Sequence, residues 1–402
     1  MRCKILVPIA VMLGVSKIQA QTFNSGSNGS DGALNLATPG TILFDPRALN
    51  LDADGDNVYH FTTINIGPGV IVKLRANLVP GPVFWLAQGT VTIAGTIDLN
   101  GENGHPSNSL PAARVPSVAG AGGYSGGVGK FGANLAQPGA GPGGGLVFPI
   151  YQGGQNFPYG SGGNFTGNAF LVPLIGGSGG GGSPNEESNG GAGGGAGGGA
   201  ITIASSTSIL VNGLISATGG TCGGGLAGGG SGGGIRLAAP TIGGSGSFST
   251  LTESSAANAC SNGRGPGGAG ITRLEAFQQN FTGGTIKGTF FRATPFNTFL
   301  PSGQSSVKVL TVGGVAVPPN PTGSFSAPDV TLNSTAAVLF AIEARNIPTG
   351  TVVKLQIFSE TGADLTIDSS PLVGTPQVSS ASASAILPSG FSRGFVRATW
   401  VQ

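Results

Sequence analysis

Three aspartates at alternate positions, Asp52, Asp54 and Asp56, form the densest acidic group in the chain. A calcium loop begins with such alternating carboxylates, because a hard cation is held by several oxygen ligands. The later positions depart from that loop, since Asn57 replaces its glycine and Thr63 replaces its bidentate glutamate. Aspartate and glycine also favour an ordinary turn before a strand. The sequence therefore gives two alternatives, a candidate calcium site or a plain turn, and no other cofactor is expected.

A second acidic pair, Asp98 and Glu102, follows a short apolar run. Two neighbouring carboxylates can divide acid and base roles in glycoside cleavage. The related runs further along the chain add no aligned acidic residue, and Arg236 stands alone there. Charged residues make up only 8% of the chain, against about 25% in typical globular proteins. We therefore expect no catalytic residues. The alternative is a polysaccharide lyase or glycoside hydrolase built on Asp98 and Glu102.

Cys222 and Cys260 are the only cysteines beyond residue 3. Their separation of 38 residues is close to the 33–34-residue spacing of the apolar repeats described below. Neighbouring repeats would place the two thiols near each other, and disulfides persist in exported proteins. We expect a disulfide between them, with two free thiols as the alternative.

The first 21 residues have the pattern of an export signal. Arg2 and Lys4 precede an apolar stretch, residues 5–15, that is too short to span a bilayer, and Ala20 offers a small residue for cleavage. Without this segment the net charge is about −1, so no basic surface remains to bind nucleic acid. No later apolar run is long enough to cross a membrane. The sequence predicts a secreted or cell-surface protein.

Apolar and glycine positions recur at fixed spacing in residues 83–101, 201–219 and 235–248. The second copy lies 118 residues after the first, and the third follows 33–34 residues later. Short alternating strands cannot bury a core alone, so such recurrence indicates units that stack on one another. We predict an all-β chain with a right-handed parallel β-helix, or β-solenoid, over residues 61–300. Residues 22–60 are expected to cap its open end.

A glycine-rich insertion at residues 101–199 interrupts the repeat. Glycine occupies 14 of the 24 positions from 176 to 199, against a usual share of about 7%. Three arrangements are open. The insertion could be disordered, because ordering glycine is entropically costly. It could form extended polyglycine helices that pack on one another, or it could contain further degenerate coils.

Phenylalanines gather after the third copy, at Phe277, Phe281, Phe290, Phe291, Phe296 and Phe299. We expect them to plug the end of the β-helix, since aromatic side chains dominate core burial. A platform on which a ligand stacks is the alternative.

Glycine becomes sparse after residue 301, and longer alternating segments begin. We count seven strands, at 307–312, 329–332, 336–345, 351–359, 364–368, 379–387 and 391–401. Seven short strands separated by turn residues within about 100 positions are typical of a small immunoglobulin-like β-sandwich. The predicted sandwich covers residues 301–402.

The segments 198–204 (GGAITIA), 209–220 (ILVNGLISATGG) and 232–237 (GGGIRL) resemble coils of glycine-rich exported bacterial β-helix surface proteins. The resemblance spans residues 60–290 and assigns no functional residue. It implies a structural or adhesive protein at the bacterial surface or in a matrix. The expected partners are extracellular glycans or other surface polymers. The ligand and the oligomeric state do not follow from the sequence.

Overall fold

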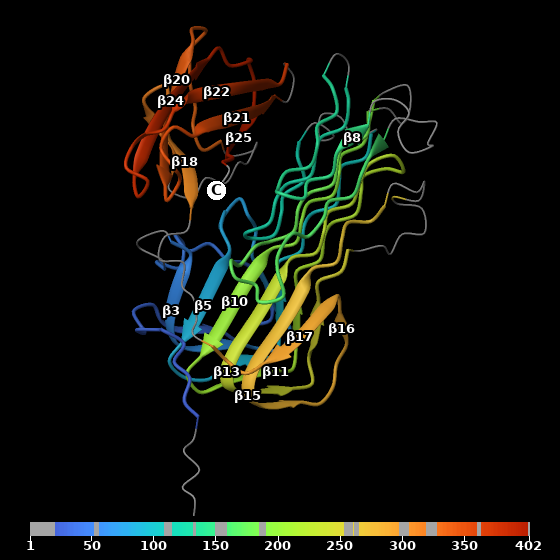
Figure 1. The fold of residues 1–402 in the computed structure, drawn as a ribbon, viewed down its shortest axis with the longest axis vertical. Helices are drawn as coiled ribbons and strands as arrows, with labels where there is room; N and C mark the ends of the chain where they lie inside the picture. Colours follow the sequence, from blue (N-terminus) through green and yellow to red (C-terminus); the bar gives the residue numbers. More distant parts are fainter. Residues whose placement is uncertain are drawn as a thin grey trace, which may run out of the picture.

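The computed structural model describes residues 21–51, 56–107, 115–131, 134–148, 159–184, 190–252, 260, 265–296, 305–318, 328–359 and 363–400. Within these ranges the regular structure consists of β-strands, with no helix. Figure 1 shows three parts: parallel strands below, extended segments that run upward from them, and a separate group of C-terminal strands in orange and red.

Two parallel sheets form the lower part, and their strands are short runs rich in β-branched residues. The larger sheet contains β1 (Gly32–Leu36), β3 (Val58–Ile66), β5 (Val83–Ala87), β6 (Val91–Ile93), β10 (Ala200–Ser205), β11 (Ser208–Val211), β13 (Gly234–Gly244), β15 (Ile271–Phe281) and β17 (Thr289–Ala293). The smaller sheet contains β2 (Gly40–Leu43), β4 (Val70–Lys73), β7 (Thr96–Asp98), β12 (Leu214–Ser216), β14 (Ser247–Ser249) and β16 (Ile286–Lys287).

The three repeated segments lie side by side in these sheets. Ile201 of β10 lies opposite Val83 of β5 on one side and opposite Ile235 of β13 on the other. In the smaller sheet, β12 pairs in parallel with β7 and with β14. All three of these side chains in the larger sheet are buried in one core. The spacing of apolar residues therefore identified true strand neighbours.

The prediction of a right-handed parallel β-helix followed by an immunoglobulin-like sandwich is nevertheless wrong as a description of the fold. In the larger sheet the pairing closes on itself around six parallel strands, β3–β5–β10–β13–β11–β6 and back to β3, while the other sheets are open. The cause is strand length. β3 has 9 residues and β13 has 11, so each pairs with two short strands that a turn separates.

The space between the parallel sheets is filled by one apolar core. Rows of isoleucine, valine and leucine from successive strands are buried there. Near its N-terminal end four aromatic rings pack together, with centroids 5.2–6.2 Å apart: Phe44, Tyr59, Phe61 and Trp85. Burying one such large side chain contributes about 1.5–3 kcal/mol. This burial opposes the entropy lost when the strands become ordered.

The glycine-rich segments form a second body, which we call the glycine bundle: residues 99–105, 117–120, 124–130, 137–145, 160–163, 176–183, 191–199, 217–223 and 228–233. Its backbone hydrogen bonds join neighbouring segments and recur at every third residue. The amides of Gly177, Gly180 and Ser183 donate to the carbonyl oxygens of Gly198, Gly195 and Ala192, at 2.7–2.8 Å. A period of three is that of an extended polyproline II-type helix. Much of the described part of the insertion thus consists of packed polyglycine helices, beside a two-stranded antiparallel sheet of β8 (Val147–Phe148) and β9 (Tyr159–Gly160).

Residues 191–199 lie at the centre of the glycine bundle. Hydrogen bonds join this segment to six others, at residues 99–105, 117–120, 124–130, 177–183, 217–223 and 228–231. Backbone atoms of these neighbours lie so close to the glycines of this segment that a side chain does not fit there. A Cβ on Gly194 would lie 2.0 Å from the carbonyl oxygen of Gly180, and a Cβ on Gly197 would lie 1.9 Å from that of Gly177. Glycine is required here because backbone occupies the space of a Cβ.

Residues 305–400 form two open antiparallel sheets that share one core. One contains β18 (Ser306–Val312), β19 (Val315–Ala316), β20 (Val338–Arg345), β23 (Val373–Gly374) and β24 (Ser379–Ala385). The other contains β21 (Val352–Ser359), β22 (Leu365–Pro371) and β25 (Ser392–Ala398). Six of the seven predicted strands are present. Residues 329–332 form no strand.

Candidate functional site

Asp98 and Glu102, the predicted alternative catalytic pair, line one small hollow. Asp98 is the last residue of β7, and Glu102 follows where the chain enters the glycine bundle. The hollow has a volume of about 220 Å³. Its lining residues are Arg75, Asp98, Asn100, Gly101, Glu102, Asn103, Thr218 and Gly219.

Both carboxylates hold neighbouring backbone or side chains in place. Oδ2 of Asp98 accepts a hydrogen bond from Nη2 of Arg75 at 3.3 Å, and Oδ1 accepts one from the amide of Asn100 at 2.9 Å. Oε2 of Glu102 accepts a hydrogen bond from the amide of Val118 at 2.9 Å. A general acid or base must instead face the proton that it transfers. The contacts in the hollow are those of a structural junction.

Two asparagines in the same hollow tie the first repeat to the second. Oδ1 of Asn100 accepts hydrogen bonds from Oγ of Ser216 at 2.6 Å and from the amide of Thr218 at 2.8 Å. Oδ1 of Asn103 accepts one from the amide of Thr221 at 2.9 Å. Sequence reasoning missed these residues and Arg75. The 118-residue spacing was the available signal, because it sets Asn100 opposite Thr218.

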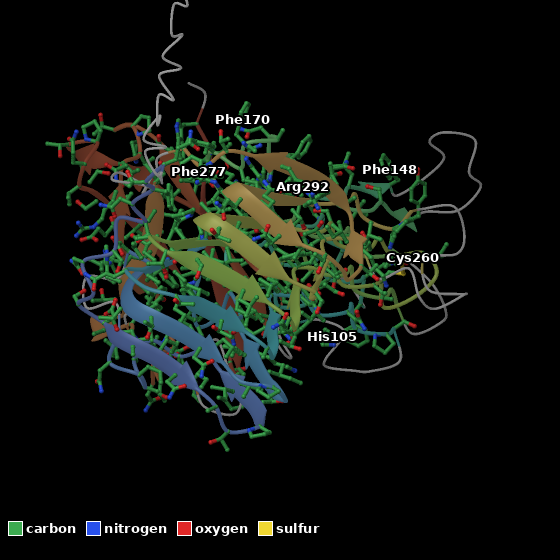
Figure 2. The ribbon with its side chains drawn as sticks, turned by 90° about the horizontal axis from the view of Figure 1, so that it is seen from below. His105, Phe148, Phe170, Cys260, Phe277 and Arg292 are labelled. Carbon is green, nitrogen blue, oxygen red and sulfur yellow. A yellow bond between two sulfur atoms is a disulfide. The ribbon has the colours of Figure 1, made fainter. Side chains whose placement is uncertain are left out.

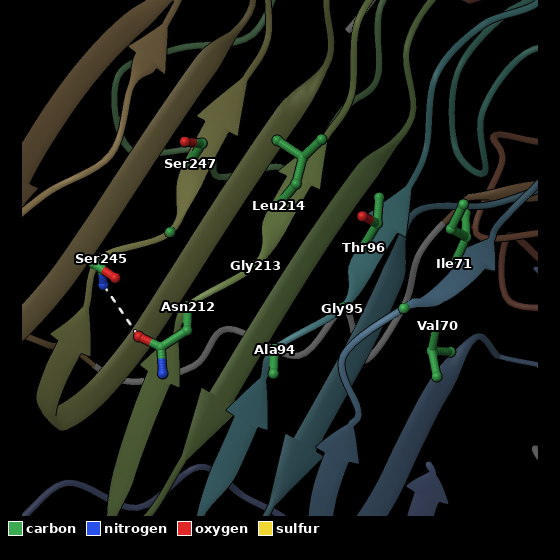
Figure 3. A pocket seen from close by; sticks show the side chains of 12 residues that line it. Val70, Ile71, Ala94, Gly95, Thr96, Asn212, Gly213, Leu214, Ser245 and Ser247 are labelled. Carbon is green, nitrogen blue, oxygen red and sulfur yellow. Dashed lines mark hydrogen bonds between the residues drawn. The ribbon is translucent and has the colours of Figure 1, made fainter. Parts of the chain in front are cut away.

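A larger groove crosses the smaller sheet where the strands of successive repeats begin (Figure 3), and we call it the corner groove. Its volume is about 520 Å³, and no charged residue lines it. Asn212 spans two repeats there, since its Oδ1 accepts a hydrogen bond from the amide of Ser245 at 3.2 Å. The lining residues are Gly69, Val70, Ile71, Ala94, Gly95, Thr96, Asn212, Gly213, Leu214, Ser245, Gly246 and Ser247.

The candidate calcium site lies only partly within the described residues. Asp52 and Asp54 are outside them. Oδ1 of Asp56 accepts a hydrogen bond from the amide of Val58 at 2.8 Å, which caps the start of β3. In the described part of the chain, no group of three or more histidine, cysteine, aspartate or glutamate residues could hold a metal ion. The contact of Asp56 is the one expected of an aspartate in a turn.

The predicted disulfide is confirmed: Cys222 and Cys260 are joined, with their Cα atoms 5.8 Å apart. Cys222 packs with Ala192 and Ala227, so the bond lies against the glycine bundle. Figure 2 shows Cys260 on the same side of the molecule as Phe148, away from Phe170. The bond therefore attaches the segment after β14 to the outer part of the bundle.

Replacing both cysteines by serine is expected to lower the free energy of unfolding of the glycine bundle by about 3–4 kcal/mol, because the bond closes a long loop of the unfolded chain. Hydrogen exchange of the amides in residues 219–233 would measure this loss. A reducing agent should speed exchange in the wild-type protein and change nothing in the double-serine variant. Equal protection in both proteins would contradict the expectation.

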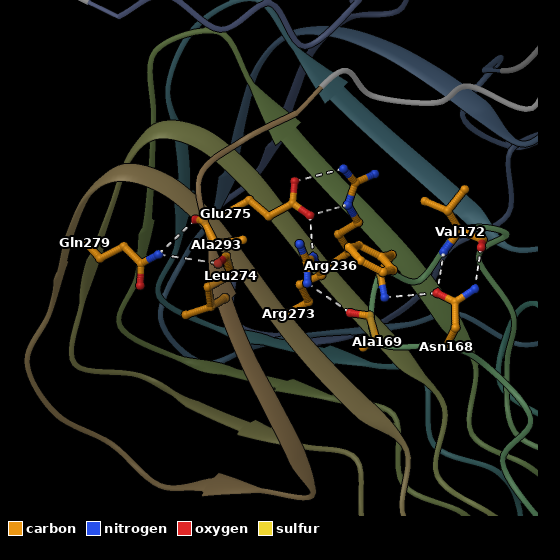
Figure 4. A network of polar contacts seen from close by, with 10 residues as sticks. Asn168, Ala169, Val172, Arg236, Arg273, Leu274, Glu275, Gln279 and Ala293 are labelled. Atoms are coloured by element: carbon orange, nitrogen blue, oxygen red, sulfur yellow. Dashed lines mark hydrogen bonds and ion pairs between the residues drawn. The ribbon is translucent and has the colours of Figure 1, made fainter.

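A buried charge cluster lies on the outer face of the larger sheet (Figure 4), formed by Arg236 of β13 and by Arg273 and Glu275 of β15. Nε and Nη2 of Arg236 donate to the two oxygens of Glu275, at 3.1 and 2.8 Å. Nε of Arg273 donates to Oε1 of the same carboxylate at 2.5 Å. The side chains are 1%, 7% and 0% exposed, respectively. We call these three residues the arginine cluster.

A segment from the glycine-rich insertion covers this face, and we call it the strap (residues 164–175). Leu171 and Leu174 pack against Phe84 and Leu86 of β5 in a second apolar cluster. The carbonyl oxygen of Ala169 accepts a hydrogen bond from Nη1 of Arg273 at 3.0 Å. The strap thus joins the glycine bundle to the larger sheet through both apolar and charged contacts. Sequence reasoning missed the arginine cluster, because Glu275, the carboxylate that pairs with Arg236, lies in a different strand, β15. It also missed the strap that covers this cluster.

One tyrosine of the glycine bundle has a perturbed acidity. Burial raises the pKa of the Tyr124 phenol, and the positive charge of Arg397 partly opposes that shift. The phenol therefore stays neutral at physiological pH.

No protein-family model matches the chain, and no curated protein or solved structure matches it either. Among the described residues, no helix is long and apolar enough to cross a membrane. The disulfide is compatible with an extracellular protein.

Proposed function

We propose that the chain is an exported, non-catalytic protein that serves a structural or adhesive role at a bacterial surface or in a matrix, where it contacts glycans or other polymers. The observation that carries the proposal is the glycine bundle. Its segments bond to one another mainly through backbone atoms, and at many of its glycines neighbouring backbone occupies the space of a Cβ. A body held together in this way suits a rigid spacer or support.

The rigidity of the bundle supports this role. Each glycine loses more conformational freedom on ordering than any other residue, and the dense hydrogen bonding of residues 191–199 opposes that loss. The disulfide and the strap hold the bundle to the rest of the molecule. Such a body would keep its distant end at a fixed distance from the parallel sheets.

The corner groove is the proposed place of contact with a neutral polymer. Uncharged residues line it: four glycines, polar side chains such as Asn212, and apolar ones such as Ile71 and Leu214. Parallel strands lie about 4.8 Å apart, so the groove offers repeated hydrogen-bonding positions along its length. A linear neutral polysaccharide matches this uncharged, shallow and extended shape.

Binding to neutral polysaccharides by the secreted protein tests the proposal. Replacing the half-buried Leu214, which lines the groove, by arginine is expected to weaken binding to the best neutral polymer of a panel at least about tenfold, because the longer side chain would occupy the groove and a bound neutral polymer would desolvate its charge. Leu210→Arg is the matched control, since Leu210 is 39% exposed on β11 and does not line the groove. Loss of binding in both variants, or no binding by the wild type to any polymer, would contradict the proposal.

The alternative is a polysaccharide-degrading enzyme, and the shared hollow of Asp98 and Glu102 is the observation in its favour. Under our proposal, wild type and the Glu102→Gln variant release no reducing ends or unsaturated sugars from the same panel. An activity in wild type that falls about a hundredfold or more in Glu102→Gln would establish the enzyme, because general acid–base catalysis contributes about 10²–10⁴-fold.

Export is tested separately. The mature protein recovered outside the cell is expected to begin near residue 21, after cleavage of the signal at residues 1–21. N-terminal sequencing or intact mass would show this. A protein that keeps residues 1–21 would contradict the proposed export.

A further inference from the structure

Phe170 is exposed although its neighbours in the strap are buried. Its residue exposure is 59%, whereas Leu171 is 1% and Leu174 is 7% exposed. A single exposed apolar residue is common on protein surfaces, so this exposure by itself indicates no site. Phe170 lies on the upper side of the molecule in Figure 2. What distinguishes Phe170 is the second aromatic ring and the buried charges beside it.

The backbone around Phe170 is held firmly in place by Asn168, which Figure 4 shows beside Val172. Oδ1 of Asn168 accepts hydrogen bonds from the amides of Phe170 at 2.9 Å and Val172 at 3.4 Å, and Nδ2 donates to the carbonyl oxygen of Val172 at 2.5 Å. Leu171 has a φ of +51°, a conformation that costs a non-glycine residue free energy. The surrounding contacts hold the strap in this shape, which points Leu171 inward and Phe170 outward.

A second ring lies beside the first. The centroids of Phe170 and Phe296 are 6.5 Å apart, with planes inclined by 78°. The guanidinium of Arg236 lies 4.4 Å from the Phe296 centroid, and that of Arg273 lies 5.1 Å from the Phe170 centroid. Arg273 covers one face of the Phe170 ring, so the exposed part of the ring is its opposite face and its edges. Cation–π contacts thus hold both rings from behind.

The charge behind these rings is positive. The arginine cluster contains two guanidinium groups and one carboxylate, so its net charge is +1. In the described part of the chain, Glu275 is the only carboxylate that forms a salt bridge with either arginine. Charges in a low-dielectric interior are weakly screened, so the excess is felt at the nearby surface. A ligand that stacks on Phe170 would gain from a negative charge.

We propose that Phe170 and Phe296 form a binding platform for an acidic glycan, in which a sugar ring stacks on Phe170 and its carboxylate is attracted by the arginine cluster. The site differs from the corner groove, which is uncharged and lies on the smaller sheet. It extends the proposed adhesive function to a second class of polymer, the polyuronates.

Affinity measurements with oligomeric alginate test this site, and dextran serves as the neutral probe. Phe170→Ala is expected to weaken alginate binding roughly three- to tenfold, in line with the contribution of an aromatic contact. Phe170→Trp should retain it, because tryptophan also presents an aromatic face. Phe131→Ala is the matched control, since Phe131 is a 38%-exposed phenylalanine directly after residue 130 of the glycine bundle. Thermal unfolding would verify that each variant keeps its fold.

Salt gives an independent readout. Alginate binding should weaken as sodium chloride rises from low to high concentration, because salt screens the attraction of the cluster for carboxylates. Binding of a neutral polymer should not. Alginate affinity that is equal in wild type, Phe170→Ala and Phe131→Ala would overturn the platform while leaving the adhesive function intact. Failure to bind either kind of polymer would instead overturn the adhesive function.

Discussion

Replacing Glu275 by glutamine is expected to lower the free energy of unfolding of the parallel sheets by about 3–5 kcal/mol, the usual cost of breaking a buried ion pair by removing one partner. Glu275 is 0% exposed and is the counter-ion of two buried arginines. A glutamine amide has nearly the same shape but no charge. Two guanidinium groups would then remain buried without a carboxylate.

The measurement needs a probe that reports the parallel sheets alone. Trp85 is fully buried in their core, and the chain's other tryptophan, Trp400, packs on the C-terminal core. In a Trp400→Phe background, denaturant unfolding followed by tryptophan fluorescence therefore reports the parallel sheets. Comparing Glu275→Gln with its parent in that background gives the loss directly.

A matched control separates burial from ion pairing as such. Glu343 also contacts two cations, Arg345 at 3.0 Å and Lys308 at 3.4 Å, but these cations are about half exposed. Glu343 lies in β20 of the C-terminal sheets, so its variant is measured by hydrogen exchange of β20. Glu343→Gln should cost less than about 1 kcal/mol, because water screens such pairs. Replacing the whole arginine cluster, by Arg236→Met, Arg273→Met and Glu275→Leu together, should recover much of the stability. A loss in Glu275→Gln no larger than in Glu343→Gln would refute the argument.

Replacing Gly197 by alanine is expected to destabilise the glycine bundle by about 3 kcal/mol or more, at or above the upper end of ordinary overpacking. The new Cβ would lie 1.9 Å from the carbonyl oxygen of Gly177 and 2.2 Å from its carbonyl carbon. Backbone atoms cannot move aside as a flexible side chain can. Their displacement would also break the hydrogen bonds that Gly177 and Gly197 form with neighbouring segments.

Gly268→Ala is the control for this experiment. Gly268 also belongs to the glycine-rich part of the chain, but the atom nearest to its Cβ would be the Phe165 amide nitrogen at 3.4 Å, an ordinary contact. Hydrogen exchange of residues 176–199 should show lost protection in Gly197→Ala and wild-type protection in Gly268→Ala. Equal effects of the two substitutions would show that close backbone approach is not what requires glycine.

Some features of the chain followed from local pattern alone. Runs of alternating apolar residues that end at glycine indicated where the strands lie. The 33–34- and 118-residue spacings indicated which strands are neighbours. The same spacing predicted the bond between Cys222 and Cys260. Asp98 and Glu102 were expected to lie near each other because they follow one strand four residues apart, and they share one hollow. The sequence did not indicate that Arg75 and Val118 engage them.

Glycine content could not decide between order and disorder. Residues 176–199 have the same composition in a loose insertion and in a packed bundle, and the difference depends on whether six neighbouring segments supply hydrogen-bond partners. The closed pairing of the larger sheet was missed for a related reason. It arises because β3 and β13 are each long enough to pair with two short strands, and strand length was not visible in the repeat.

The sequence by itself therefore determined the strand content, the neighbouring repeats and the disulfide, because these depend on residue types at short or regular spacing. Only the tertiary structure decided the glycine bundle, the closed pairing and the arginine cluster. The pairing of Arg236 with Glu275 depends on the alignment of β13 with β15, and Phe170 contacts Arg273 from a segment about 100 residues away. Such contacts are set by the path of the whole chain, which local pattern does not encode.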